Sequence, residues 1–163
     1  IPVSKIDSNI IRQSNPTRIL ILSPARLSNP AYLDQMVIPT SCSDYVMAEW
    51  HLYAAGPSKD PNSKKYWHTG TEEEMQNIRD IINLGVEWQE RTGIPTWIGG
   101  GPGNYNKGDD YTVEEQCVFA SFMKSELERY DLPWAVNSLD KFYDIYNNCW
   151  YDDMQPLIDV LAK

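Results

Sequence analysis

The sequence has few of the residues that build disulfide frameworks, metal sites or nucleotide sites. Its three cysteines, Cys42, Cys117 and Cys149, are widely spaced and odd in number, which fits neither a disulfide framework nor a zinc site. We expect them to be buried thiols. No Gly-x-Gly-x-x-Gly and no phosphate-loop motif follows the first predicted strand. We therefore expect no cofactor and no bound metal.

Long apolar runs and positive charge are also scarce. No apolar run approaches the roughly twenty residues that cross a bilayer. The formal net charge is -9 and the pI is about 4.6, a balance that opposes phosphate backbones and anionic lipids. We expect no nucleic acid partner and no membrane partner. We expect an extracellular location. The first residues, Ile1-Pro-Val-Ser4, have no basic n-region or cleavage site, so the signal for secretion would lie outside this chain. The missing initial methionine predicts a fragment.

What the sequence does contain is enough apolar residues for one packed domain. Of 163 residues, 42% are hydrophobic and 12% aromatic, so we expect a single domain over residues 1–163. Apolar periodicity and Pro or Gly breaks predict alternating helices and strands. Helices are predicted over 4–14, 71–91, from 112 onward and over 154–161, a helical turn over 31–36, and strands over 17–23, 45–53, 96–100 and 133–137.

Two helices begin with the same local signal. Thr71-Glu-Glu-Glu74 and Thr112-Val-Glu-Glu115 are capping boxes, and Gly93 marks the end of the first of these helices. Apolar residues at helical spacing are predicted to face inward, namely Met75, Ile78 and Ile82 in the first helix and Val118, Phe119, Phe122, Met123 and Leu127 in the second.

Four strand and helix pairs in alternation predict an α/β fold with a parallel sheet. An open doubly wound sheet and an arc of a (βα)8 barrel share this pattern. The long loops, over 54–70 and 101–110, follow strands, which suits functional loops in both folds.

The strand over 45–53 carries an unusual polar face. Period-2 alternation places Glu49, His51 and Tyr53 together, where apolar residues would be the simpler choice. A carboxylate in such an interior needs a partner, for which Arg18 or Arg26 is predicted, and a catalytic role for Glu49 is the alternative. The indoles of Trp50, Trp88 and Trp97 are expected to pack between sheet and helices instead.

These residues together carry a family resemblance that covers nearly the whole chain. The ordered elements are Asn15-Pro-x-Arg18, an apolar strand, Pro39, His51-x-Tyr53, a loop with Trp67, Pro95-x-Trp-x-Gly99 and a strand with Trp134. The series resembles strands five to eight of glycoside hydrolase family 5, whose members are cellulases and related enzymes. The resemblance implies that the chain supplies about half of a TIM (βα)8 barrel, as four βα units.

The resemblance also implies a catalytic arrangement that this chain does not complete. Retaining glycosidases need an acid/base and a nucleophile about 5 Å apart. The family's acid/base would precede Ile1, and its nucleophile is the Glu of a Trp-x-Gly-Glu pattern, where this chain has Trp97-Ile-Gly-Gly100. His51 and Tyr53 resemble the residues that hold the reacting sugar near the nucleophile. Substrate-binding residues are then expected at Trp134, which resembles a sugar-stacking Trp, and at Asn137, Trp67 and Tyr105.

We therefore predict a chain derived from a β-1,4-glucan hydrolase, with Gly100 in the nucleophile position. The alternatives are a non-catalytic glycan-binding module or pseudoenzyme that uses aromatic stacking residues, Tyr53 among them, and an open flavodoxin-like interaction domain. Half a barrel leaves two open sheet edges and an uncovered face. The predicted partner is therefore the N-terminal half of the barrel or a second copy of the chain, with a β-glucan as ligand.

Overall fold

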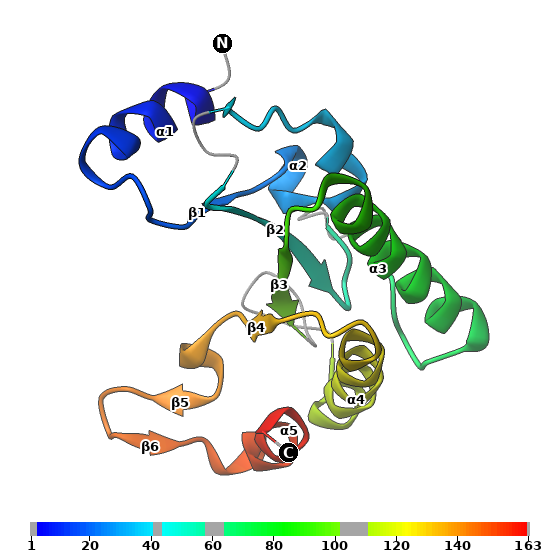
Figure 1. Cartoon of the computed structure of the whole chain (residues 1–163). Coiled ribbons are helices and arrows are strands. Elements are labelled where there is room, and N and C mark those ends of the chain that lie inside the picture. Colours follow the sequence, from blue (N-terminus) through cyan, green and yellow to red (C-terminus); the bar gives the residue numbers. More distant parts are fainter. Residues whose placement is uncertain (1–2, 41–43, 58–63, 102–110, 163) are drawn as a thin grey trace.

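Four parallel strands in consecutive order form the central sheet (Figure 1). The structure is a computed structural model that describes residues 3–40, 44–57, 64–101 and 111–162. The strands are β1 (Leu20–Leu22), β2 (Val46–Tyr53), β3 (Thr96–Gly101) and β4 (Trp134–Val136). A doubly wound sheet reverses its strand order at a switch point, whereas a barrel arc does not. The order β1-β2-β3-β4 therefore favours the barrel arc.

The predicted helices form in the predicted order, and α2 is an additional short helix that was not predicted. They are α1 (Val3–Ser14), α2 (Ala25–Ser28), α3 (Glu72–Thr92), α4 (Val113–Arg129) and α5 (Gln155–Ala162), with 3-10 turns η1 (Pro30–Gln35), η3 (Leu139–Lys141) and η4 (Asp152–Met154). Both capping boxes form, with Thr71 and Thr112 accepting from the backbone N–H of Glu74 and Glu115. Gly93 ends α3 with φ 69°, a left-handed conformation that glycine adopts without strain.

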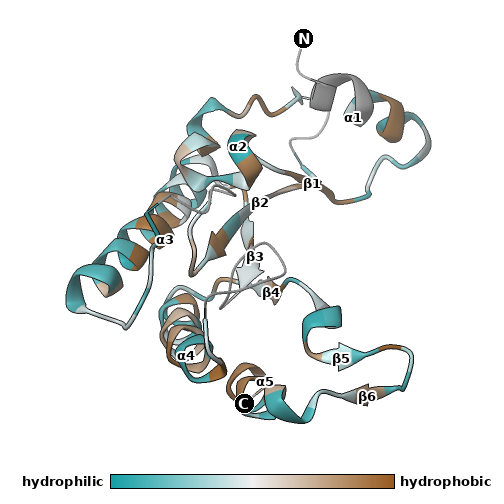
Figure 2. Ribbon diagram, turned by 180° about the vertical axis from the view of Figure 1, so that it is seen from behind, coloured by the Kyte–Doolittle hydropathy of each residue, from teal (hydrophilic) through white to brown (hydrophobic). Residues whose placement is uncertain are grey.

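Helices α3 and α4 cover one face of the sheet, on the right in Figure 1. Strand residues Trp50, Leu52 and Ile98 pack in one core with helix residues that include Ile78 and Phe119. Figure 2 shows hydrophilic and hydrophobic residues alternating along α3, as expected of a helix with one buried side. The core therefore lies between the helices and one sheet face, and the other face carries the candidate site.

Some local predictions differ from the structure. The first strand is shorter than predicted, and Ile21 within it is 51% exposed. Val118, predicted to face inward, is 50% exposed. Cys149 is exposed and Cys117 is half-buried, so neither is the fully buried thiol that was expected, and Cys42 lies outside the described residues.

A two-stranded antiparallel hairpin that was not predicted follows β4. Its strands are β5 (Tyr143–Asp144) and β6 (Cys149–Trp150), each too short to show alternation in the sequence. Among the described residues, β1 and β4 are the edge strands of the main sheet, and each pairs with a strand on one side only. Within the described part of the chain, no helix combines the length and hydropathy needed to cross a membrane.

Candidate functional site

A row of polar side chains lies on the sheet face opposite α3 and α4. The β2–β3 register pairs Glu49 with Trp97, His51 with Gly99 and Tyr53 with Gly101. Residues paired in a parallel ladder point to the same face. Alternation places these residues opposite Trp50, Leu52 and Ile98, which are buried against the helices. The predicted grouping of Glu49, His51 and Tyr53 on one face agrees with this geometry.

Glu49 bridges β1 and β2 through hydrogen bonds. His51 Nε2 lies 2.6 Å from Glu49 Oε1, and Ser23 Oγ donates to Glu49 Oε2 at 2.7 Å. The prediction that Arg18 or Arg26 pairs with Glu49 is wrong. Arg18 donates to Asn15 instead, and the described partners of Glu49 are His51 and serines. Burial raises the pKa of Glu49, but the hydrogen bonds from His51 and Ser23 outweigh it, so the pKa lies below 4.5. The carboxyl group is therefore ionised at neutral pH.

Tyr53 and Asn137 form the second polar contact of this face. Asn137 Nδ2 donates to the Tyr53 hydroxyl at 3.0 Å, which joins β2 to the end of β4. The His51 ring meets the Tyr53 ring edge-on, with centroids 5.6 Å apart. Tyr53 is only 2% exposed, so its ring has no open face on which a sugar could stack. The structure thus brings together four of the predicted site residues, namely Glu49, His51, Tyr53 and Asn137.

Gly100 has no room for a side chain. A Cβ atom built there would lie 2.0 Å from the Leu52 carbonyl oxygen. The β3 positions that share the polar face are 97, 99 and 101. Trp97, predicted to pack between sheet and helices, therefore lies on the polar face. The assignment of Gly100 to the nucleophile position stays a prediction.

Two of the predicted stacking residues, Trp67 and Trp134, do not lie on the polar face. Trp67 is fully buried, with Phe119 and Phe122 ring centroids at 5.3 Å and 5.4 Å. Trp134 pairs with Ile98 and is half-buried against the core on the helix side. Tyr105 lies outside the described residues. A stacking role for Trp67 would need the core to open, and one for Trp134 stays a prediction.

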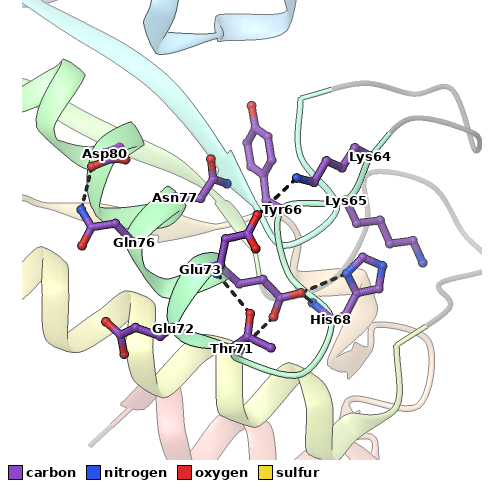
Figure 3. A pocket seen from close by; sticks show the side chains of 11 residues that line it. Lys64, Lys65, Tyr66, His68, Thr71, Glu72, Glu73, Gln76, Asn77 and Asp80 are labelled. Atoms are coloured by element: carbon purple, nitrogen blue, oxygen red, sulfur yellow. Dashed lines mark hydrogen bonds and ion pairs between the residues drawn. The ribbon is translucent and has the colours of Figure 1, made fainter.

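A polar pocket of about 820 Å³ lies at the start of α3, away from the polar row (Figure 3). Glu74 organises it by accepting from the backbone N–H groups of His68, Gly70 and Thr71, at 2.8 to 3.0 Å. Burial raises the pKa of Glu74, but these hydrogen bonds outweigh it and lower that pKa. The pocket is thus a helix-capping loop whose central carboxylate is already engaged. Across the described residues, no three His, Cys, Asp or Glu side chains cluster to hold a metal ion.

Residues 5–141 match the cellulase family, glycosyl hydrolase family 5. The chain belongs to this family. The match includes every strand of the main sheet, so the ordered residues that suggested the resemblance identified the family correctly. No curated protein matches the chain.

Solved structures of similar fold extend well beyond this chain. Cellulose synthase subunit Z from Clostridioides difficile is similar with a TM-score of 0.77 and 18% identity, over 98% of this chain and 54% of that chain. A mutant form of Thermotoga maritima Cel5A in complex with cellobiose is similar with a TM-score of 0.75 and 20% identity, over 98% of this chain and 52% of that chain. The chain spans about half the length of the structures it resembles. The α/β fold is therefore confirmed as about half of a family 5 TIM barrel.

Sequence reasoning missed Ser23 and the orientation of Trp97. Ser23 contacts Glu49 because β1 and β2 pair with Leu22 opposite Ala48, a register that no local pattern specifies. The orientation of Trp97 could have been predicted, because residues 97, 99 and 101 alternate onto one face of the strand. The assumption that Gly100 points to the polar face placed Trp97 on the opposite face instead.

We expect the Glu49 network to weaken in acid. Because the pKa of Glu49 is lowered in the folded chain, its contribution to stability is full above about pH 4.5 and is lost as pH falls through the folded-state pKa. The Glu49→Gln variant lacks this titration. Thermal unfolding from pH 6 to pH 3 should therefore show a smaller decline in Tm for Glu49→Gln than for the unmodified chain. Parallel declines would contradict the prediction.

Proposed function

We propose that this chain is the C-terminal half of a glycoside hydrolase barrel whose polar face binds β-1,4-glucan. The observation that carries the proposal is the polar row on the face opposite the helices. Hydrogen bonds join Ser23 to Glu49, Glu49 to His51, and Asn137 to Tyr53, and the His51 ring meets the Tyr53 ring edge-on. Such fixed polar groups suit the hydroxyl groups of a sugar. Family membership and the similarity to Cel5A, whose solved structure is a complex with cellobiose, support a glucan as the ligand.

In the complete enzyme the reaction would follow the retaining mechanism. A nucleophilic carboxylate attacks the anomeric carbon while a carboxylic acid protonates the leaving oxygen, and water then releases the glycosyl group. The main sheet of this chain contains one carboxylate, Glu49, and its two oxygens already accept from His51 and Ser23. We therefore propose that the chain alone binds glucan without hydrolysing it, because the covalent intermediate needs a nucleophile that position 100 does not supply.

The supporting residues have distinct proposed roles. Asn137 is exposed and would present its amide to a sugar, while the buried Tyr53 hydroxyl, which accepts from Asn137 Nδ2 at 3.0 Å, would fix that amide in place. His51, packed edge-on against Tyr53, would shape the adjoining wall. This arrangement keeps the polar groups preorganised, which limits the ordering cost of binding.

The proposal includes a partner that covers the open face. Ile19 and Ile21 at the β1 edge are 57% and 51% exposed, more than a finished barrel interior allows. The similar structures are about twice as long as this chain. We propose the N-terminal half of the barrel as the covering partner, with a second copy of the chain as its substitute. A polymeric glucan does not cross membranes, so the proposed site of action is extracellular.

The test is to incubate the chain with soluble β-glucan and to measure binding and reducing ends in parallel. We expect binding without release of reducing ends. His51→Ala should weaken binding by about tenfold, because the loss of the ring releases Glu49 and removes part of the wall of the site. His68→Ala is the matched control, because His68 lies at the α3 pocket, and it should bind as the unmodified chain does.

Two outcomes would contradict the proposal. Failure of the folded chain to bind any soluble β-glucan would remove the ligand assignment. Release of reducing ends that Glu49→Gln abolishes would show that the chain hydrolyses without a carboxylate at position 100 and that Glu49 takes part in the reaction.

The second candidate is a non-catalytic glycan-binding module or pseudoenzyme. The absence of room for a side chain at Gly100 favours it. Hydrolysis by the chain joined to its N-terminal half would exclude this candidate, and binding without hydrolysis by that complete protein would establish it.

A further inference from the structure

Glu49 and His51 form a short, shielded contact on the polar face. The distance from His51 Nε2 to Glu49 Oε1 is 2.6 Å, and the two side chains are only 18% and 12% exposed. Ser23 Oγ holds the other carboxylate oxygen at 2.7 Å. Glu49 is thus fixed from both sides, by Ser23 directly after β1 and by its neighbour His51 on β2.

The protonation state of the pair follows from the carboxylate. Hydrogen bonds outweigh burial and lower the pKa of Glu49, so its oxygens act only as acceptors at neutral pH. The proton in the 2.6 Å contact must therefore sit on His51 Nε2. The other ring nitrogen, Nδ1, is buried. Neither nitrogen is then open to a ligand approaching the face.

Gly99 supplies the space that the pair occupies. A Cβ atom built at Gly99 would lie 2.6 Å from Glu49 Oε1 and 3.1 Å from His51 Cδ2. Both side chains therefore fold across β3 above Gly99, next to the predicted nucleophile position. Any larger residue at position 99 would displace the pair.

We propose that Glu49 is a positioning residue that fixes the ring orientation and the proton position of His51 across Gly99. With Nε2 engaged and Nδ1 buried, the group that this pair offers to a ligand is the carboxylate, whose remaining lone pairs can accept from sugar hydroxyl groups beside the bonds to His51 and Ser23. The effect on glucan rests on the proposed function, whereas the effect on the His51 ring does not depend on any ligand.

The chain contains two histidines, so imidazole signals in a nitrogen-15 NMR spectrum are few and assignable. At neutral pH we expect a downfield, exchange-protected N–H signal from His51 Nε2, and contacts between the His51 ring and the Gly99 α-protons. His68 is the internal control. Its Nδ1 lies 3.1 Å from Glu74, but its side chain is 57% exposed, so we expect fast exchange and no protected signal.

Variants separate positioning from a general structural role. Glu49→Ala should abolish the protected His51 N–H signal and the contacts with Gly99. Glu49→Gln retains an acceptor oxygen and should keep the contacts, with the signal shifted upfield. The inference is overturned if the unmodified chain lacks the protected signal, or if the signal persists in folded Glu49→Ala. If Glu49→Ala does not fold, an unshifted signal in Glu49→Gln overturns the inference.

Titration with cellohexaose tests the consequence for the ligand. We expect Glu49→Ala to bind about tenfold more weakly than the unmodified chain, because a fixed acceptor and the ring orientation are lost together. Equal binding by both would overturn the role in glucan recognition. If the unmodified chain shows the protected signal but binds no cellohexaose, the proposed function fails and the positioning of His51 stands.

Discussion

Replacing Gly100 with glutamate, the residue that the family pattern places there, should destabilise the fold and should not create hydrolysis. A Cβ atom at position 100 would lie 2.0 Å from the Leu52 carbonyl oxygen and 2.8 Å from the Leu52 carbonyl carbon. Both are backbone atoms of β2, paired directly with Gly100, so no rotamer change relieves the clash. We expect Gly100→Glu to lower the free energy of unfolding by about 3 kcal/mol, as severe overpacking does.

Urea unfolding followed by circular dichroism measures this effect, and a reducing-end assay on soluble β-glucan checks activity. Gly101→Ala is the matched control, because the nearest atom to a Cβ there is the Asn137 carbonyl oxygen at 3.5 Å, an ordinary contact. It should unfold within about 1 kcal/mol of the unmodified chain. A Gly100→Glu variant as stable as the control would show that β3 readily adopts a backbone with room for a carboxylate, contrary to this structure.

The architecture was predictable because its signals are local. The capping boxes at Thr71 and Thr112 specify the starts of α3 and α4, and the glycine at position 93 specifies the end of α3, with groups a few residues apart. Period-2 alternation identified the polar face of β2, because Glu49, His51 and Tyr53 belong to one strand. The ordered motif series then identified the family, which residues 5–141 match.

The contacts of the site were less predictable because they depend on how strands pair. Ser23 reaches Glu49 only through the register between β1 and β2. Trp67 lies in the long loop that follows β2, a position that suggests an exposed aromatic ring. In the structure its ring instead packs against two phenylalanines of α4. A sequence pattern states which residues are aromatic, and tertiary packing decides which of their rings remain accessible.

Substitution of Trp67 provides the second large expected effect. Trp67→Ala should lower the free energy of unfolding by about 4 kcal/mol, because deleting a fully buried indole loses its burial and leaves a cavity. The ring packs against Phe119 and Phe122, and its backbone carbonyl accepts from the Tyr111 hydroxyl at 2.6 Å. Urea unfolding at neutral pH gives the change from the midpoint and slope of the transition.

Trp150→Ala is the matched control, since it deletes the same side chain where it is 47% exposed, on the β5–β6 hairpin. Its cost should stay near 1 kcal/mol, because the indole contacts the Tyr143 ring but leaves no enclosed cavity. Equal effects of the two substitutions would contradict the burial of Trp67. If Trp67→Ala left stability unchanged but weakened binding to β-glucan, the ring would belong to the binding surface instead. We expect Trp67→Ala to lose stability while its folded fraction binds β-glucan as the unmodified chain does. That result would place Trp67 in the core that holds β2 against α4. Contact with the glucan would then belong to the polar face on the opposite side of the sheet.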